Sequence, residues 1–143
     1  MSLHGPYDPQ NIFAKILRGE MPCVPVFEDQ HILCIMDAFP QSKGHALVIP
    51  KNPSRNLLEV EPKNIGRLFG AAQRIARAVD KALSPDGIIV TQYSGAPAGQ
   101  TVFHTHIHII PKYEGGALQA HNSSQMADAS DLEKTAKLIA ANL

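Results

Sequence analysis

Apolar residues recur along the chain with two periods, one typical of helices and one typical of β-strands. A period of three to four residues in segments 9–18, 62–83 and 130–143 predicts three helices. Short apolar runs between turn residues predict five strands, at 24–27, 32–36, 45–50, 88–93 and about 101–111. The inner face of the long helix is expected to hold Ile65, Leu68, Phe69, Ala72, Ile75, Ala76, Val79 and Leu83.

The order of these elements predicts one α+β domain over residues 1–143, with mostly antiparallel strands and a few packed helices. Strands 24–27 and 32–36 flank a polar turn and are expected to pair as a hairpin. Asp8 is the expected N-cap of the first helix, and Ser130 with Glu133 forms an expected capping box before the last. No internal repeat or interdomain linker divides the sequence.

Three of the seven histidines, His104, His106 and His108, occupy alternate positions in the last predicted strand. Side chains of a strand alternate between its two faces, so all three imidazoles are expected on one face. Imidazoles are poor core residues because each ring has two nitrogens that need partners when buried. The pattern therefore indicates a site for a metal ion or for an anionic group.

The loop before the histidines favours the anion. Residues 94–101 read Ser-Gly-Ala-Pro-Ala-Gly-Gln-Thr, and such small residues let backbone amides approach an anion closely. Gln100 and Thr101 add side-chain donors. Three histidines also suit zinc, but no Asp, Glu or Cys accompanies them in the motif. We therefore expect a phosphate site that uses neither a metal nor another cofactor.

Composition narrows the functional class. Hydrophobic residues make up 44% of the 143 residues and the formal net charge is zero, which disfavours nucleic acid or an anionic membrane as a partner. No apolar run has transmembrane length, and the first residues lack the features of a signal peptide. The two cysteines, Cys23 and Cys34, form no CxxC pair. A cytoplasmic protein with reduced thiols is expected.

Residues 100–111, Gln-Thr-Val-Phe-His-Thr-His-Ile-His-Ile-Ile-Pro, resemble the signature of the histidine triad (HIT) family of nucleotide hydrolases and transferases. Segments 12–22 and 37–51 resemble two further blocks of that family. The resemblance covers about residues 8–112 and leaves 113–143 as a C-terminal tail with a short helix. It implies a HIT-like fold, an antiparallel sheet of about five strands with a long packed helix, continued across a homodimer.

An alanine-rich face on the long helix also favours a homodimer, because small residues allow a second helix to approach closely. The alternative is that this face packs on the protein's own sheet. Its members are Ala71, Ala72, Ala76 and Ala78.

The resemblance also implies a mechanism. His106 would attack the α-phosphorus of a nucleotide and form a nucleotidyl-histidine that water hydrolyses. His104 and His108 would bind or orient phosphoryl oxygens, and His45 would be a fourth, more distant histidine. Asp37 would accept from the ribose hydroxyls. The remaining expected substrate-binding residues are a purine slot of Ile12, Phe13, Ile16, Ile35 and Ala38, together with Tyr93, Gln100 and Thr101. Taken alone, each apolar residue is ordinary core and Asp37 is a turn residue.

The sequence also departs from the family pattern. Asn11 and Ala14 occupy the positions where several bacterial relatives carry the CxxC of a structural zinc site, so that site is expected to be absent. Tyr93 stands where many relatives have Asn, and Lys112 where Arg is usual. The expected function is hydrolysis of a purine nucleoside phosphoramidate or adenylate, releasing a nucleoside monophosphate. A dinucleoside polyphosphate hydrolase and a nucleotide-binding interaction protein with little turnover are the alternatives.

Overall fold

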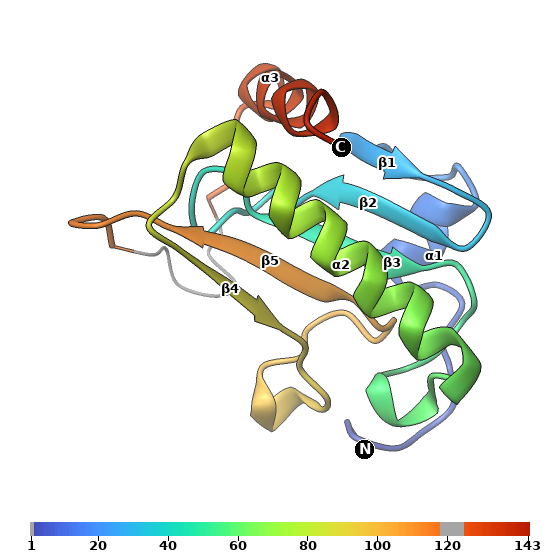
Figure 1. Ribbon diagram of the computed structural model, residues 1–143. Helices are drawn as coiled ribbons and strands as arrows, with labels where there is room; N and C mark the ends of the chain where they lie inside the picture. Colours follow the sequence, from blue (N-terminus) through green and yellow to red (C-terminus); the bar gives the residue numbers. More distant parts are fainter. Residues whose placement is uncertain (1, 118–124) are drawn as a thin grey trace.

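The computed structural model describes residues 2–117 and 125–143, which form one antiparallel sheet with helices packed on it (Figure 1). The strand order is β1-β2-β3-β5-β4. This confirms the predicted α+β class and the five-stranded antiparallel sheet. The elements are α1 (Ile12–Leu17), β1 (Pro25–Glu28), β2 (Ile32–Met36), β3 (Ala46–Pro50), α2 (Pro62–Leu83), β4 (Gly87–Thr91), β5 (Ile107–Lys112) and α3 (Ala129–Ala140), with short 3-10 turns at Leu57–Glu59 and Ala96–Ala98.

Pairing between β3 and β5 joins segments about sixty residues apart in sequence. Leu47 lies opposite His108, and Ala46 lies opposite Ile109. Because side chains alternate along a strand, Ile107 and Ile109 face α2 while His108 faces the other side of the sheet. The pairing therefore places His108 beside the residues that precede β3.

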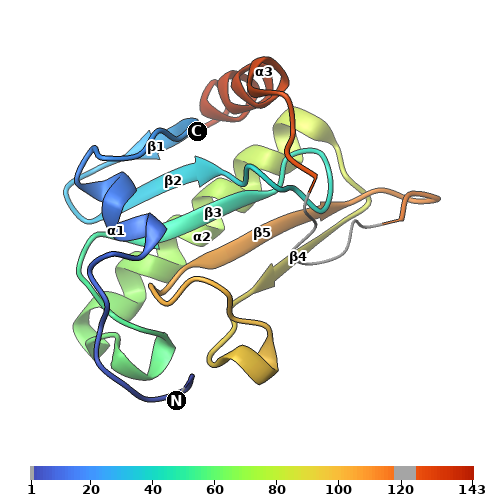
Figure 2. The same cartoon turned by 180° about the vertical axis from the view of Figure 1, so that it is seen from behind.

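The sheet buries a different apolar cluster on each face. Helix α2 packs on one face, and Figure 2 shows the short helix α1 on the opposite one. The α1 side holds a smaller cluster, in which Phe13 packs with Leu33, Ile35, Leu47 and Ile49. The larger cluster is formed by Val26, Ile32, Cys34, Met36, Ala46, Val48, Leu68, Ala71, Ala72, Ile75, Ala78, Val79, Ile107, Ile109, Leu132, Ala136 and Ile139.

The alanines of α2 lie inside this larger cluster. Ala72 and Ala78 are almost completely buried against the protein's own sheet, and Ala71 is nearly so. For Ala71, Ala72 and Ala78 the alternative is therefore correct: they pack inside the protein's own core and are not available to a partner's helix, whereas Ala76 is only partly buried. Phe69, expected on the inner face, is instead 41% exposed.

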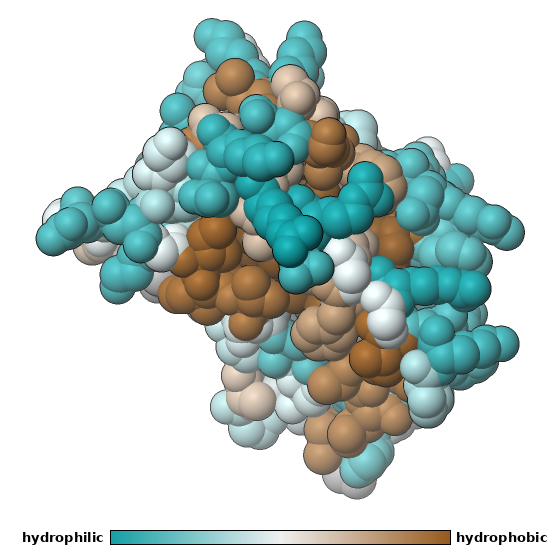
Figure 3. Space-filling model, viewed as in Figure 1, coloured by the Kyte–Doolittle hydropathy of each residue, from teal (hydrophilic) through white to brown (hydrophobic). Residues whose placement is uncertain are grey.

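The two edges of the sheet differ in their cover. Helix α3 packs beside β1 at one edge and also contacts α2, whereas β4 forms the other edge (Figure 1). Ile89 and Val90 of β4 are exposed, and Figure 3 shows apolar surface over this strand. Among the described residues, no helix is long and apolar enough to cross a membrane.

Most predicted elements are present, but several ends differ from the predictions. The bounds of β2 and α2 match the predicted ranges 32–36 and 62–83. Helix α1 begins later than expected, because Asn11 accepts from the amide of Ala14 and is the N-cap, whereas Asp8 accepts from the amide of Gln10 in a preceding turn. Helix α3 is capped by Asp128, so the predicted capping box is not used.

Candidate active site

The three triad histidines are buried, but only His108 lies in a strand. The expected strand over 101–111 begins only at Ile107. Residues before it turn toward the loop that follows β3, where the Thr105 amide donates to the Ser54 carbonyl at 2.9 Å and the two hydroxyls are 2.7 Å apart. Because Ser54 already takes up the hydrogen bonds of the Thr105 amide and hydroxyl, this segment does not continue the pairing of β5 with the sheet. Alternation along a single strand therefore does not explain how the three rings are arranged.

His104 is held at both ring nitrogens. Its Nε2 lies 2.8 Å from the Pro50 carbonyl oxygen, and its Nδ1 lies 2.6 Å from the Tyr7 hydroxyl. A carbonyl oxygen only accepts, so the proton is on Nε2 and Nδ1 accepts from Tyr7. Burial lowers the pKa of His104, which favours this neutral form. With both nitrogens bonded inside the protein, His104 is not placed to bind a phosphoryl oxygen as expected.

His106 has the geometry of a nucleophile. Its Nδ1 is 2.7 Å from the carbonyl oxygen of His104, so Nδ1 carries the proton and donates it. In the neutral ring the lone pair is then on Nε2, on the opposite side of the imidazole. The ring of Phe13 packs edge-on at 4.8 Å between centroids, and the ring of His108 lies 4.9 Å away. These contacts fix the direction of the lone pair.

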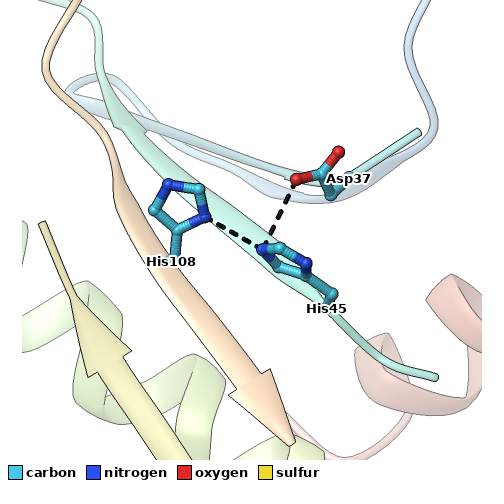
Figure 4. A group of neighbouring side chains, drawn as sticks. All are labelled: Asp37, His45 and His108. Carbon is cyan, nitrogen blue, oxygen red and sulfur yellow. Dashed lines mark hydrogen bonds and ion pairs between the residues drawn. The ribbon is translucent and has the colours of Figure 1, made fainter. Parts of the chain in front are cut away.

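A second chain of hydrogen bonds orients His108. The Gln41 amide donates to Nδ1 of His45 at 3.0 Å, so His45 carries its proton on Nε2. That nitrogen is 2.9 Å from Nδ1 of His108, which places the His108 proton on its Nε2. His45 is therefore a direct partner of the triad and not the distant fourth histidine expected. Figure 4 shows His45 between His108 and Asp37, whose Oδ2 is 3.4 Å from His45 Nε2.

Asp37, His45 and His108 also form the one group of three potential metal ligands found among residues 2–117 and 125–143. Their ligand atoms all lie within 4.8 Å of one another. Two imidazole nitrogens on one tetrahedral zinc ion are about 3.3 Å apart, given Zn–N bonds of about 2.0–2.1 Å. The 2.9 Å between His45 and His108 is instead an ordinary hydrogen-bond distance. The spacing fits a hydrogen-bonded pair better than a zinc site.

The small-residue loop is closed by Gln100. Its Oε1 accepts from the Gly95 amide at 2.8 Å, and its Nε2 donates to the carbonyls of Arg55 and Val102. Gln100 is almost completely buried, so its amide holds the loop together and is not the substrate donor that was expected. Thr101, in contrast, is exposed.

Tyr93 packs between the loop and the triad. Its ring centroid is 5.3 Å from that of His108. Gly99 has a φ of +114°, and a Cβ at that position would lie only 3.3 Å from the Tyr93 ring. A glycine is needed there for both reasons. Tyr93 therefore forms an aromatic wall beside His108.

The expected purine slot is divided between core and surface. Phe13 and Ile35 belong to the buried α1-side cluster, and Ile16 packs against it. Ile12 is 43% exposed, and Ala38 is half-buried. The structure brings Phe13 against His106, so the residues of the expected slot in the α1-side cluster lie next to this histidine. Oδ1 of Asp37 accepts a hydrogen bond from the Phe39 amide, two residues later. For that oxygen, the alternative prediction that Asp37 is an ordinary turn residue is therefore correct.

Sequence reasoning missed Tyr7, Gln41 and Ser54 as parts of the site. Tyr7 and Ser54 bond to partners 97 and 51 residues away, which no spacing pattern marks. Gln41 instead acts through its backbone amide on His45, four residues later. Cavities also lie away from the triad in the part of the chain that the structure describes, one beside the loop after β3 and one beside the start of β4, and no triad histidine lines either of these. The larger, about 380 Å³, is bounded by the loop after β3 and the start of α2.

Comparison with known proteins places these residues in a family context. The HIT domain matches residues 18–115. The chain is 43% identical over 112 residues to the adenylylsulfatase HINT3 of Arabidopsis thaliana, a match that covers 78% of this chain and 57% of that protein. The chain therefore spans little more than half the length of that relative.

Two solved structures share the fold. A Hit-like protein involved in cell-cycle regulation from Bartonella henselae has 45% identity and a TM-score of 0.91, covering 97% of this chain and 100% of its own. A hypothetical histidine triad nucleotide-binding protein from Sulfolobus tokodaii has 30% identity and a TM-score of 0.83, with 91% and 89% coverage.

Proposed function

This chain belongs to the HIT family, and from that premise we propose that it is a nucleotide hydrolase that uses His106 as a covalent nucleophile. It releases a purine nucleoside monophosphate from a phosphoramidate or adenylate-type substrate. One observation carries the proposal. The bond from His106 Nδ1 to the His104 carbonyl leaves the lone pair of a neutral imidazole on Nε2, the form that a histidine nucleophile requires.

The proposed reaction has two steps. First, Nε2 of His106 attacks the α-phosphorus, an N–P bond forms, and the bond from phosphorus to the leaving group breaks with its electron pair. His108, with its proton on Nε2, donates a hydrogen bond to a phosphoryl oxygen or to the departing atom. Water then attacks phosphorus and loses a proton, and the N–P bond breaks with its electron pair returning to Nε2, so that His106 regains its neutral form as the monophosphate leaves. The proton lost by the water balances the one that the departing atom takes up in the first step.

The charge of the site favours a small or uncharged leaving group. No Asp, Glu, Lys or Arg occurs from Gly87 to Pro111, which includes the whole loop and all three triad histidines. A polyphosphate leaving group has several negative charges, which proteins usually bind with Lys or Arg. An amine or a single acid group has less negative charge and needs fewer cationic side chains around it. The name of the Arabidopsis relative agrees with an adenylate substrate. A dinucleoside polyphosphate hydrolase is the second candidate.

We assign the nucleoside to the α1 side of the sheet. Ile12 and Ile16 would contact the purine base together with Phe13, Ile35 and Ala38, near His106. The Asp37 carboxylate would accept from the ribose hydroxyls, and Thr101 would donate to the phosphate. A cytoplasmic location is part of this proposal, and it is supported by Cys23 and Cys34, which are both free thiols.

A substrate panel tests the function. Release of nucleoside monophosphate is measured from adenosine and guanosine phosphoramidates, a cytidine phosphoramidate, adenylyl sulfate and a diadenosine polyphosphate. The purine phosphoramidates or adenylyl sulfate should give the highest kcat/KM. A higher value for the diadenosine compound would favour the second candidate. Binding of AMP without turnover of any compound would support the interaction protein and contradict the proposal.

A further inference from the structure

The segment from Ser2 to Asp8 lies along the loop that links β3 to α2 (Figure 2). Arg55 donates through Nε to the Ser2 carbonyl at 3.0 Å, and also to the Pro6 carbonyl. The Asn56 side chain, fully buried, donates to the Leu3 carbonyl at 2.8 Å. Three hydrogen bonds to backbone carbonyls therefore hold this segment, which we term the N-terminal strap, in one place.

The strap ends by inserting Tyr7 against the triad. The Tyr7 hydroxyl is 2.6 Å from Nδ1 of His104, across 97 residues of sequence. The two rings also pack edge-on, with centroids 5.7 Å apart. Nε2 of His104 is already bonded to the Pro50 carbonyl, so the Tyr7 hydroxyl is the donor for the second ring nitrogen, Nδ1. Without it, a nitrogen lone pair would be buried without a donor, which is costly.

We propose that Tyr7 is a positioning residue for the nucleophile, and this inference rests on the proposed function. The hydroxyl of Tyr7 fixes His104 as the Nε2–H tautomer and fixes the orientation of its ring. The backbone carbonyl of His104 accepts a hydrogen bond from Nδ1 of His106. Tyr7 therefore acts on His106 through His104, by holding the carbonyl that selects the reactive tautomer.

The hydroxyl and the ring of Tyr7 have separable roles. Phenylalanine at this position keeps the edge-on packing with His104 and loses only the hydrogen bond. One buried hydrogen bond has a net value of about 0.5–1.5 kcal/mol. If its loss raises the activation free energy by that amount, kcat is expected to fall by up to about tenfold. The KM and the affinity for AMP should change little, because the Tyr7 hydroxyl is bonded to His104 and acts on the reaction only through that residue.

The experiment compares Tyr7→Phe with Tyr113→Phe. The Tyr113 hydroxyl donates to the backbone carbonyl of Lys43, so the control removes the same atom from a hydrogen bond outside the triad. Steady-state kinetics give kcat and KM, and long-range ¹H–¹⁵N spectra report the ring nitrogens. In Tyr7→Phe, kcat should fall while KM stays within twofold, and the His104 Nδ1 resonance should move downfield. The Tyr113→Phe protein should retain the wild-type values.

Two outcomes would overturn the inference: a Tyr7→Phe kcat within twofold of wild type, or unchanged His104 and His106 ring resonances. If the wild type proves inactive on every substrate, the proposed function fails and the spectra alone decide the role of Tyr7. If Tyr7→Phe does not fold, the wild-type spectrum decides, because the structure requires His104 to have a hydrogen-bonded, unprotonated Nδ1.

Discussion

His106 and His104 are joined by a bond between a side chain and the main chain: the imidazole Nδ1–H of His106 donates to the carbonyl oxygen of His104 at 2.7 Å. The tautomer of His106 is thus set by its neighbour in the triad, His104, which acts through its backbone carbonyl and not through its ring. The ring of His104 has a separate task, since it anchors that backbone between Tyr7 and Pro50. The rings of His104 and His106 therefore make different kinds of contact, although the two residues are only two positions apart.

Replacing His106 with Asn should abolish turnover, by about 10³-fold or more, because the attacking nitrogen is lost. The affinity for AMP should stay within a few-fold, since Asn retains a polar group of similar reach. A denaturing quench at alkaline pH, which preserves N–P bonds, should trap labelled nucleotide on His106 of the wild type only. His31→Asn is the matched control and should behave as wild type. Label on His104 or His108 would show that the assignment is wrong.

Exhaustive chelation should leave activity unchanged, because His45 and His108 are at hydrogen-bonding distance, which is shorter than the separation expected for two ligands of one zinc ion. Activity is measured before and after dialysis against a chelator, with elemental analysis of the same sample. Loss of turnover that zinc restores would assign the Asp37, His45 and His108 group to a metal ion.

The protein is expected to be a homodimer that pairs through the edge strand β4. The edge near β1 is covered by α3, whereas Ile89 and Val90 are apolar and exposed on β4. Val90→Lys should convert the dimer to a monomer in light scattering at micromolar concentration. Leu138→Lys, on the exposed face of α3, is the control and should remain dimeric. A wild-type monomer at that concentration would contradict the prediction.

Stability should fall as the pH drops below about 6.5. Burial lowers the pKa of His104 in the folded protein, whereas the unfolded chain takes up a proton near the ordinary value of about 6.5. Below that pH the unfolded state binds more protons, so the stabilisation present at neutral pH is lost as the pH falls toward the folded pKa. Urea midpoints between pH 8 and 5.5 measure the effect. His104→Gln should flatten the slope and His31→Asn should not; equal slopes in all three proteins would rule out His104 as the cause.

Local sequence determined the elements whose energetics are local. Helix α2 begins at Pro62 and ends at Leu83, as its apolar period and flanking turn residues predict, because a long amphipathic helix with a proline in its first turn depends little on distant partners. Strand β2, uniformly apolar between turn residues, was likewise predicted at its observed bounds. The spacing of the histidines also indicates where the candidate site lies, because three imidazoles are side chains that a core strand does not need.

Tertiary structure alone decided what each site residue does. Spacing put three imidazoles on one strand face, but Thr105 bonds to Ser54 and the strand starts only after His106. Gln100 was expected to donate to substrate and instead closes its own loop. The physical reason is the same in both cases: a buried polar group takes the nearest partner that folding supplies, and that partner can lie anywhere in the sequence. Tyr7, 97 residues from His104, is such a partner, and no local sequence pattern predicts its contact with His104.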